Sequence, residues 1–364
     1  MVCIHRDLFQ LLRGYASLTP PNRLQYPSHL QTRIVHDFLL EHILLSPHFE
    51  QYPASSDYQK SFWKWVISRL EQTDPELEVD VRIYDLYLKF LNSPSGSGVS
   101  TLSGPNPPSQ SYVTHFWKVG QHTALGDSVE LEEYQTTTLL ESRTMIEAGT
   151  TGLRTWLASF VQAQYLIHNP ALVQGKRILE LGAGIGFLGI IVGSLQLHGS
   201  SSESDTSSPG AIWMSDVNES VLSRCKDNFN LACNLSSTHP NMRCCFLDWS
   251  AALIPDGVLP LTSLLNDEID ADLVLGSDIV FDPDLIPSLV AVLCIILQGH
   301  NRTAIIALTT RNPTTMGKFT RTVADRGLVL ETLDFRVKDW IFMESLEFTG
   351  DTTSVSLYRI TGKE

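Results

Sequence analysis

Ile178-Leu-Glu-Leu-Gly-Ala-Gly-Ile-Gly-Phe-Leu-Gly189 is the stretch of this sequence that decides the fold. An apolar strand that carries one acidic residue, Glu180, leads directly into a loop with four closely spaced glycines. Glycines lack a Cβ atom, so the backbone can turn tightly and approach a ligand closely. The pattern therefore predicts an α/β domain that holds an adenosine-containing molecule at the end of this strand.

The same glycines fit two different cofactors. Gly184-x-Gly186-x-x-Gly189 matches the dinucleotide fingerprint, whereas Gly182-Ala183-Gly184-x-Gly186 after Glu180 matches the fingerprint of S-adenosyl-L-methionine sites. A dinucleotide site needs a pyrophosphate at a helix N-terminus. An S-adenosylmethionine site depends instead on carboxylates for the ribose and on apolar walls for the sulfonium. The residues that follow the loop must decide between the two.

Strands and helices alternate around the glycine loop. Strands are expected at 177–181, 211–216, 242–248, 271–277, 303–309, 328–335 and 352–360, and helices at 154–168, 186–197, 218–232, 284–298 and 314–326. The last two strands have no helix between them, so the final strand is expected to be antiparallel. The predicted fold class is α/β, a doubly wound sheet that binds its ligand at the carboxyl ends of the strands.

Acidic residues end two of these strands. A carboxylate at Asp216 can accept hydrogen bonds from both ribose hydroxyls, although it can also cap the next helix. In Leu247-Asp248-Trp249, Asp248 can accept from the adenine amine while Trp249 covers the base; the alternative is a solvent-facing Asp beside a packing Trp. Dinucleotide sites rarely need this pair, so it favours S-adenosylmethionine.

Ser277-Asp278-Ile279-Val280-Phe281 follows the fourth strand, where the transferred methyl group is expected. Methyl transfer demands a deprotonated, well-positioned nucleophile. Asp278 can orient a lysine amine and Phe281 can wall its aliphatic stem, so both are the predicted catalytic residues. An Asn/Asp-Pro-Pro-Tyr run, typical of methylation of planar nitrogens, is absent from the sequence. The structural alternative is that Asp278 caps the following helix.

Two further residues flank the expected site. Trp156, shortly before the first strand, either folds over the methionine part of the cofactor or belongs to the core. Arg311, at the end of the fifth strand, either contacts acidic groups of a substrate or forms a structural ion pair. The sequence leaves both questions open and favours the cofactor contact for Trp156.

Composition and spacing exclude several classes. A formal net charge of −14 argues against a nucleic-acid partner, because such proteins carry basic stripes that neutralise phosphates. The histidines show no His-Glu-x-x-His spacing and the cysteines no Cys-x-x-Cys, so no metal site is predicted. No signal peptide is recognisable, and the longest apolar run, Leu289–Leu297, is too short to span a bilayer. We expect a cytoplasmic monomer with no membrane partner.

The N-terminal part has a different organisation. Residues 93–111 are rich in Ser, Pro and Gly and predict a flexible linker between a helical domain, 1–92, and the α/β domain, 112–364. Candidate strands at 112–119 and 129–134 predict a hairpin at the start of the second domain. A Ser-rich insertion at 198–210 is expected to form a loop.

At these motifs the chain resembles the seven-strand protein-lysine methyltransferases of family 16. The matching pieces are Thr151-Gly-Leu-Arg-Thr-Trp156, Leu179–Gly186, Leu247–Trp249 and Asp278-x-x-Phe281. The segments Phe9–Tyr15, Gln51–Pro53 and Tyr58–Phe62 are similar to the extra helical domain of the lysine methyltransferases of translation elongation factor 2.

The resemblance implies an S-adenosylmethionine-dependent enzyme that methylates a lysine of elongation factor 2. It implies cofactor contacts at Trp156, the Gly182–Gly184 turn, Asp216, Trp249 and Ser277, while Asp278 and Phe281 meet the lysine. Phe281 stands where many relatives have Tyr, so no hydroxyl assists there. Alternatives are a methyltransferase for another protein or a small molecule, a non-catalytic S-adenosylmethionine-binding interaction module, and an NAD oxidoreductase.

Overall fold

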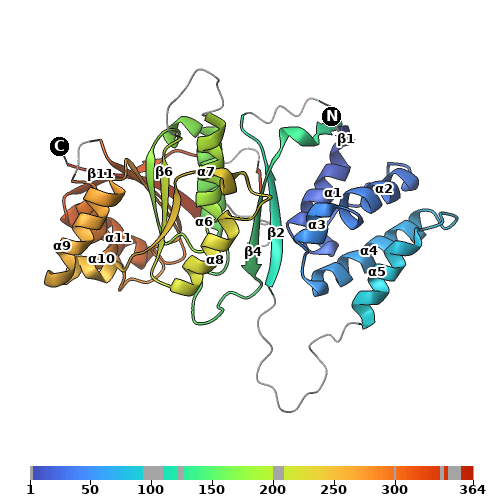
Figure 1. Cartoon of the computed structure of the whole chain (residues 1–364), viewed down its shortest axis with the longest axis horizontal. Helices are drawn as coiled ribbons and strands as arrows, with labels where there is room; N and C mark the ends of the chain where they lie inside the picture. The colour runs from blue at the N-terminus through green and yellow to red at the C-terminus, as the bar shows by residue number, and fades with distance from the viewer. Residues whose placement is uncertain are drawn as a thin grey trace, which may run out of the picture. The chain divides into compact units, whose positions relative to one another are not determined.

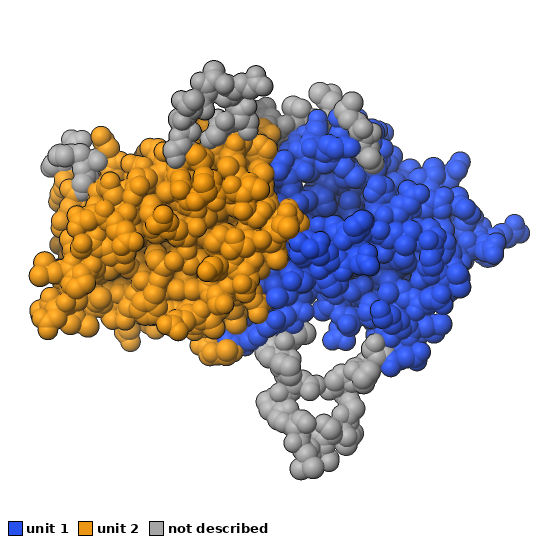
Figure 2. Space-filling view, viewed as in Figure 1, with its two compact units in different colours: residues 1–118, 122–147, 342–347 blue, residues 119–121, 148–341, 348–364 orange. Residues whose placement is uncertain are grey.

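The structure is a computed structural model that describes residues 3–92, 110–120, 126–199, 209–298, 301–336, 340–342 and 354–363. The chain divides into two compact units, which Figure 2 colours separately. The first comprises residues 1–118, 122–147 and 342–347, and the second comprises residues 119–121, 148–341 and 348–364. Most of the predicted linker, 93–111, and of the Ser-rich insertion, 198–210, lies outside the described residues.

The first unit contains five α-helices: α1 (Arg6–Ala16), α2 (Thr32–Leu39), α3 (Pro47–Gln51), α4 (Ser56–Thr73) and α5 (Val81–Asn92). The short helical turns η1 (Pro21–Arg23) and η2 (Leu40–Leu44) lie between them. Helices α1, α2, α4 and α5 confirm that residues 1–92 are largely helical. Their aromatic residues form a core: Phe62 and Trp63 are fully buried, and the Tyr15 ring lies 4.6 Å from that of Phe62.

The first unit also holds two small antiparallel sheets. β1 (Cys3–His5) pairs with β3 (Ser128–Glu130), and β2 (Gln110–Trp117) pairs with β4 (Gln135–Ser142). The predicted hairpin is therefore wrong in its second strand, because β2 pairs with 135–142 rather than with 129–134.

Buried threonines explain this pairing. Trp117 Nε1 donates to Thr137 Oγ1 at 2.9 Å, and the hydroxyls of Thr114 and Thr138 lie 3.0 Å apart. Such cross-strand polar pairs stabilise a two-stranded ribbon. A search for alternating apolar residues does not detect strands of this kind. This ribbon was assigned to the second domain from the sequence, yet it groups with the helices of the first unit.

The second unit is built on one seven-stranded sheet with the order β10-β11-β9-β8-β5-β6-β7. Its strands are β5 (Arg177–Leu181), β6 (Ala211–Asp216), β7 (Met242–Phe246), β8 (Leu273–Ser277), β9 (Thr303–Thr309), β10 (Leu328–Leu333) and β11 (Val355–Gly362). β11 is antiparallel to both β9 and β10, as predicted, and the β7-β6-β5-β8-β9 pairings are parallel. The doubly wound α/β fold is confirmed.

Helices cover both faces of this sheet (Figure 1). Helices α6 and α7 pack together on one face, where α8 also lies, and α10 and α11 pack together on the other with α9 beside them. Their bounds are α6 (Leu157–His168), α7 (Phe187–Gly199), α8 (Glu219–Phe229), α9 (Pro255–Ser263), α10 (Ile286–Ile296) and α11 (Pro313–Asp325). Short turns are η3 (Leu131–Glu133) in the first unit and η4 (Pro170–Leu172), η5 (Leu235–Thr238), η6 (Trp249–Leu253) and η7 (Leu264–Ile269) in the second.

The sequence did not predict α9, because Gly257 and Pro260 within it oppose a helical pattern. The apolar run Leu289–Leu297 does form the expected buried helix, α10 with its C-cap. No helix among the described residues has the length and apolarity needed to cross a membrane. The strand order reverses between β5 and β8, so the ligand crevice of such a sheet is expected at their carboxyl ends.

Candidate functional site

A cavity of about 460 Å³ lies at the carboxyl ends of the central strands. That volume is typical of small-molecule sites. All but one of the predicted site residues line it, although they come from five separate segments of the chain: Trp156, Gly182, Ala183, Gly184, Asp216, Asp248, Trp249, Ser277, Asp278 and Phe281. Arg311, whose role the sequence left open, lines it as well.

The glycine turn after β5 forms one wall of the cavity. Gly182 and Gly184 have φ angles of +63° and +55°, in the left-handed region that favours glycine. A Cβ on Gly182 would lie 2.9 Å from Ile279 Cγ2, and one on Gly184 would lie 3.0 Å from the carbonyl oxygen of Gly152. Both positions therefore need glycine for backbone conformation and for space.

Asp216 lies at the end of β6, beside this turn. Its Oδ1 accepts from the backbone N–H of Asn218 at 3.0 Å, and its Oδ2 accepts from that of Gly184 at 3.4 Å. Burial raises the pKa of Asp216, while these backbone donors oppose the rise. The cap of α8 is Asn218, whose side chain accepts from Ser220 and Val221, so the alternative that Asp216 caps this helix is wrong.

Asp248 and Trp249 border the cavity from the end of β7. Asp248 is exposed, and its Oδ1 accepts from the backbone N–H of Ser250 at 2.8 Å, which caps η6. Trp249 is half-buried, and its indole ring lies 3.9 Å from the place of a Cβ on Gly182. An aromatic face therefore stands beside the glycine turn, where it can cover a flat base.

Glu180 is the one predicted cofactor residue outside the cavity lining. Its side chain is 3% exposed and lies beneath the loop, where a Cβ on Gly189 would lie 3.0 Å from Oε2. Burial raises the pKa of this carboxyl to about 8, the charges of Cys244 and Asp216 also raise it, and a hydrogen bond from the Gly189 backbone lowers it. Within the described part of the chain, Oε2 has no hydrogen-bond partner.

Ser277 reaches the cavity from the end of β8, and Gln162 holds it in place. Ser277 Oγ donates to Gln162 Oε1 at 2.6 Å, and Gln162 Nε2 donates to the carbonyl oxygen of Ile305 at 2.7 Å. Gln162 was not among the site residues predicted from the sequence. Its signal was present, because a glutamine stands within the apolar run Phe160-Val-Gln-Ala of α6.

Asp278 has a φ of +53°, a strained conformation for a residue with a side chain. Its Oδ1 accepts from the backbone N–H of Thr309 at 2.8 Å, and its Oδ2 accepts from Thr309 Oγ1 and Arg311 Nη2, both at 3.0 Å. The side chain is 8% exposed. Helix α10 begins only at Ile286, so the alternative that Asp278 caps it is wrong.

Arg311 thus forms an ion pair with Asp278, and its guanidinium also lies 5.0 Å from the ring centre of Trp156. Trp156 lines the cavity, and its Nε1 donates to the carbonyl oxygen of Thr151 at 3.1 Å. Phe281 is 55% exposed. An exposed aromatic ring, a cation and a buried carboxylate therefore line the same cavity as the glycine turn.

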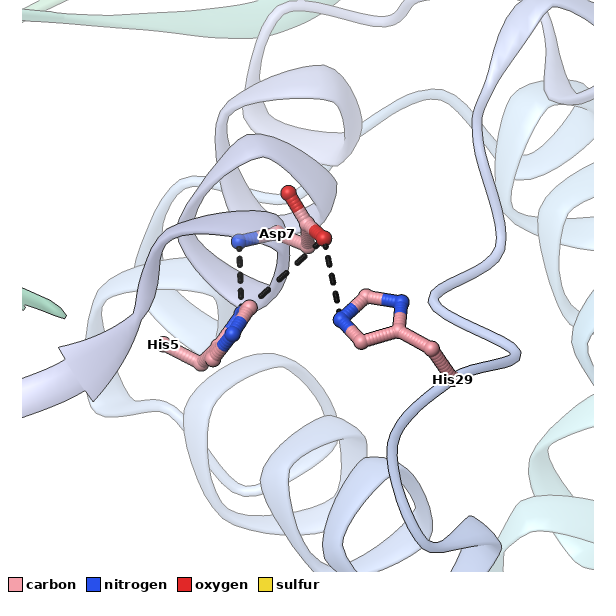
Figure 3. Close-up of side chains that lie close together, drawn as sticks. All are labelled: His5, Asp7 and His29. Carbon is pink, nitrogen blue, oxygen red and sulfur yellow. Dashed lines mark hydrogen bonds and ion pairs between the residues drawn. The ribbon is translucent and has the colours of Figure 1, made fainter. Parts of the chain in front are cut away.

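A cluster in the first unit has potential metal-binding groups that the sequence spacing did not reveal (Figure 3). One ligand atom each from His5, Asp7 and His29 lie within 4.8 Å of one another. His29 Nε2 lies 3.3 Å from Asp7 Oδ2, and His5 Nδ1 accepts from the backbone N–H of Asp7 at 3.2 Å, which caps α1. A helix cap on His5 and a contact between His29 and the Asp7 carboxylate account for this cluster.

Comparison with known proteins agrees with the site. A family model described as lysine methyltransferase matches residues 137–325, just over half of the chain. The protein-lysine N-methyltransferase EFM3 of Chaetomium thermophilum is 35% identical over 202 residues, which cover 55% of each chain. The human protein-lysine N-methyltransferase EEF2KMT is 29% identical over 202 residues, 52% of this chain and 55% of the relative.

The matches to these two relatives thus span about half of their length. EFM3 of Saccharomyces cerevisiae matches more of the chain, with 22% identity over 320 residues that cover 82% of this chain and 81% of the relative. The resemblance read from the sequence motifs is confirmed by the family match. The chain belongs to the lysine methyltransferase family.

Proposed function

We propose that this protein is an S-adenosylmethionine-dependent protein-lysine N-methyltransferase that acts on a lysine of translation elongation factor 2. One observation carries the proposal: a single cavity is lined both by the Gly182–Gly184 turn and by Asp278 and Phe281. The first group suits an adenosine-containing cofactor, and the second suits a lysine side chain. A cofactor and an acceptor can therefore meet within one cavity.

The cofactor of this family is S-adenosyl-L-methionine, and the residues present fit it. In our proposal Asp216 accepts from the ribose hydroxyls, Trp249 covers the adenine, and Asp248 accepts from its amine. The missing Cβ atoms of Gly182 and Gly184 leave room for the cofactor against the loop. Trp156 and Ser277 border its methionine part. When bound, S-adenosylmethionine supplies an activated methyl group.

The acceptor end of the cavity suits a lysine. Phe281 presents an exposed apolar ring that can pack against the four methylene groups of the side chain. Asp278 is fixed by the backbone N–H and the hydroxyl of Thr309, so its carboxylate is a rigid acceptor at the amine's place. Rigid placement of this kind favours a directed attack because little reorganisation is left for the transition state.

Elongation factor 2 is the proposed substrate because the N-terminal segments resemble those of its methyltransferases. The relative called EEF2KMT and the two proteins called EFM3 are protein-lysine N-methyltransferases by name. In this proposal the protein acts in the cytoplasm as a monomer, and residues 1–92 form its helical domain. A methyltransferase for another protein is the second candidate, since the cavity residues alone select no particular protein.

A methyl-transfer assay tests the proposal. The purified protein is incubated with S-adenosylmethionine and with elongation factor 2 from cells that lack this enzyme, and the product is mapped by peptide mass spectrometry. We expect methyl groups on one lysine of elongation factor 2. If elongation factor 2 stays unmethylated while an extract of the same cells gives methyl transfer to a different protein, the proposed substrate is contradicted and the proposed reaction stays intact.

A further inference from the structure

The acceptor end of the cavity contains a charge arrangement that the proposed reaction does not explain. Asp278 lines the cavity, and Arg311 Nη2 donates to Asp278 Oδ2 at 3.0 Å. The same guanidinium lies over the Trp156 ring, and the Arg311 side chain is 49% exposed. The half-exposed guanidinium of Arg311 is therefore already paired with the Asp278 carboxylate, at which the lysine amine is expected to bind.

This arrangement matters because lysine must react as a neutral amine. An ammonium group has no lone pair, so it cannot attack the methyl carbon. A carboxylate beside an ammonium favours the protonated form, whereas a nearby cation favours loss of the proton. Asp278 alone would thus bind the lysine well and hold it in its unreactive form.

We infer that Arg311 sets the protonation state of the acceptor lysine by neutralising Asp278. With the ion pair intact, the acceptor end carries little net charge, and the lysine enters as a neutral amine after releasing its proton to the solvent. The amine lone pair then forms the N–C bond while the electron pair of the C–S bond moves to sulfur, and the methylated nitrogen, which has become positively charged, releases one proton to the solvent. This inference rests on the proposed function.

Among the described residues, Arg311 is the one charged side chain that pairs with Asp278. The charged residues that line the cavity besides Asp278 and Arg311 are Arg154, Asp216 and Asp248. Asp216 ends β6 and Asp248 follows β7, on the adenosine side of the glycine turn. From α11, Lys318 donates to the carbonyl oxygen of Pro283 rather than to Asp278. The positive charge on the cofactor's sulfonium also favours a neutral amine. It is the same in every variant, so it does not affect the comparison between them.

The first test is the pH dependence of kcat/KM for methyl transfer to elongation factor 2. In Arg311→Gln the Asp278 carboxylate is no longer neutralised, so it should raise the apparent pKa of the acid limb by about one unit, the lower end of the effect of one adjacent charge. The rate near neutral pH should fall about tenfold and recover at high pH. Arg311→Lys should retain the normal profile. Arg321→Gln, an exposed arginine on α11 outside the cavity, is the matched control.

A double variant separates this role from a structural one. In Arg311→Gln with Asp278→Asn both charges are gone, so the acid limb should return toward its original position even if the rate stays low. The two changes should therefore be strongly non-additive in apparent pKa. A structural role for Arg311 would instead lower kcat/KM equally at all pH values and leave the acid limb unmoved, and that result overturns the inference.

A binding measurement gives a readout besides activity. Calorimetry of unmethylated elongation factor 2 binding, with S-adenosylhomocysteine present, is repeated in buffers of different ionisation enthalpy to count released protons. The original protein should release more protons than Arg311→Gln, and equal release overturns the inference. S-adenosylmethionine affinity within a few-fold of the original shows that the variant is folded. If the original protein methylates no lysine, the proposed function fails, and this inference fails with it.

Discussion

Ser277 Oγ donates a hydrogen bond of 2.6 Å to Gln162 Oε1, which ties helix α6 to the end of strand β8. Gln162 Nε2 also donates to the carbonyl oxygen of Ile305 in β9. One fully buried amide thus connects a helix to two neighbouring strands directly below the cavity. Buried polar groups that satisfy each other in this way fix one arrangement of the chain.

Gln162→Leu should therefore destabilise the second unit. The change leaves the Ser277 hydroxyl without its acceptor and the Ile305 carbonyl without one donor, so we expect a loss of about 1–3 kcal/mol in the free energy of unfolding. Urea denaturation measures it. Gln174→Leu, at an exposed position of the same unit, is the control and should change stability by less than about 0.5 kcal/mol. Equal effects of the two changes would contradict the role given to Gln162.

Gly184→Ala tests the glycine turn. The new Cβ meets the carbonyl oxygen of Gly152 at 3.0 Å and forces a side chain into a left-handed conformation. We expect S-adenosylmethionine affinity, measured by calorimetry, to fall about tenfold or more, because strain of about 1–3 kcal/mol distorts the turn. Gly175→Ala is matched: its φ is +66°, but a Cβ there meets nothing within 4 Å. If Gly175→Ala lost as much affinity as Gly184→Ala, the contact between the new Cβ at position 184 and Gly152 would not explain the loss.

Glu180 predicts a pH dependence of stability. Its pKa in the folded protein is about 8, above the usual value of 4.5, because burial disfavours the charged form. The contribution of this carboxyl is therefore most favourable below pH 4.5 and is lost as pH rises through about 8. Glu180→Gln removes this loss, so the variant should gain stability over the original protein, on the order of a few kcal/mol, as pH rises from 5 to about 9.

Chemical denaturation at several pH values measures this gain. The comparison between the two proteins cancels the titration of all other groups. A difference in unfolding free energy that stays constant between these pH values would mean that Glu180 does not titrate there.

Phe281→Ala should impair turnover without impairing folding. The ring is 55% exposed, so its removal leaves no core cavity and the thermal unfolding temperature should stay nearly unchanged. Loss of the apolar wall for the lysine stem should reduce kcat/KM about tenfold or more, the effect of one badly positioned acceptor. Phe246→Ala removes a ring that is 53% exposed but lies outside the cavity lining, so its kinetics should remain those of the original protein.

The central sheet was predicted well from the sequence because its strands are short apolar runs bounded by polar residues or glycines. The bounds of β5, β6 and β9 agree with the predicted 177–181, 211–216 and 303–309. Each of these strands lies inside the sheet and ends at a polar residue or at the glycine loop. Since parallel strands buried on both faces are continuous apolar runs, their ends are visible in the sequence.

The errors have equally specific causes. β4 escaped prediction because two successive threonines, Thr137 and Thr138, bury their hydroxyls in hydrogen bonds to side chains of the partner strand. The sequence could not show that Glu180 lies outside the cavity lining. Polar and apolar residues do not alternate along β5, so the sequence does not distinguish the two faces of this strand. The Asp278–Arg311 pair joins residues 33 positions apart, so only the parallel pairing of β8 with β9 brings them together.

The chemical identity of the methylated amino acid tests the central claim most directly. An extract of cells that lack this enzyme is incubated with the purified protein and isotope-labelled S-adenosylmethionine, and the proteins are then hydrolysed to amino acids and separated. Our account predicts that the label appears in methylated lysine and that Phe281→Ala reduces it while Phe246→Ala does not. Label in methylated arginine or glutamine, or only in small molecules, would contradict it.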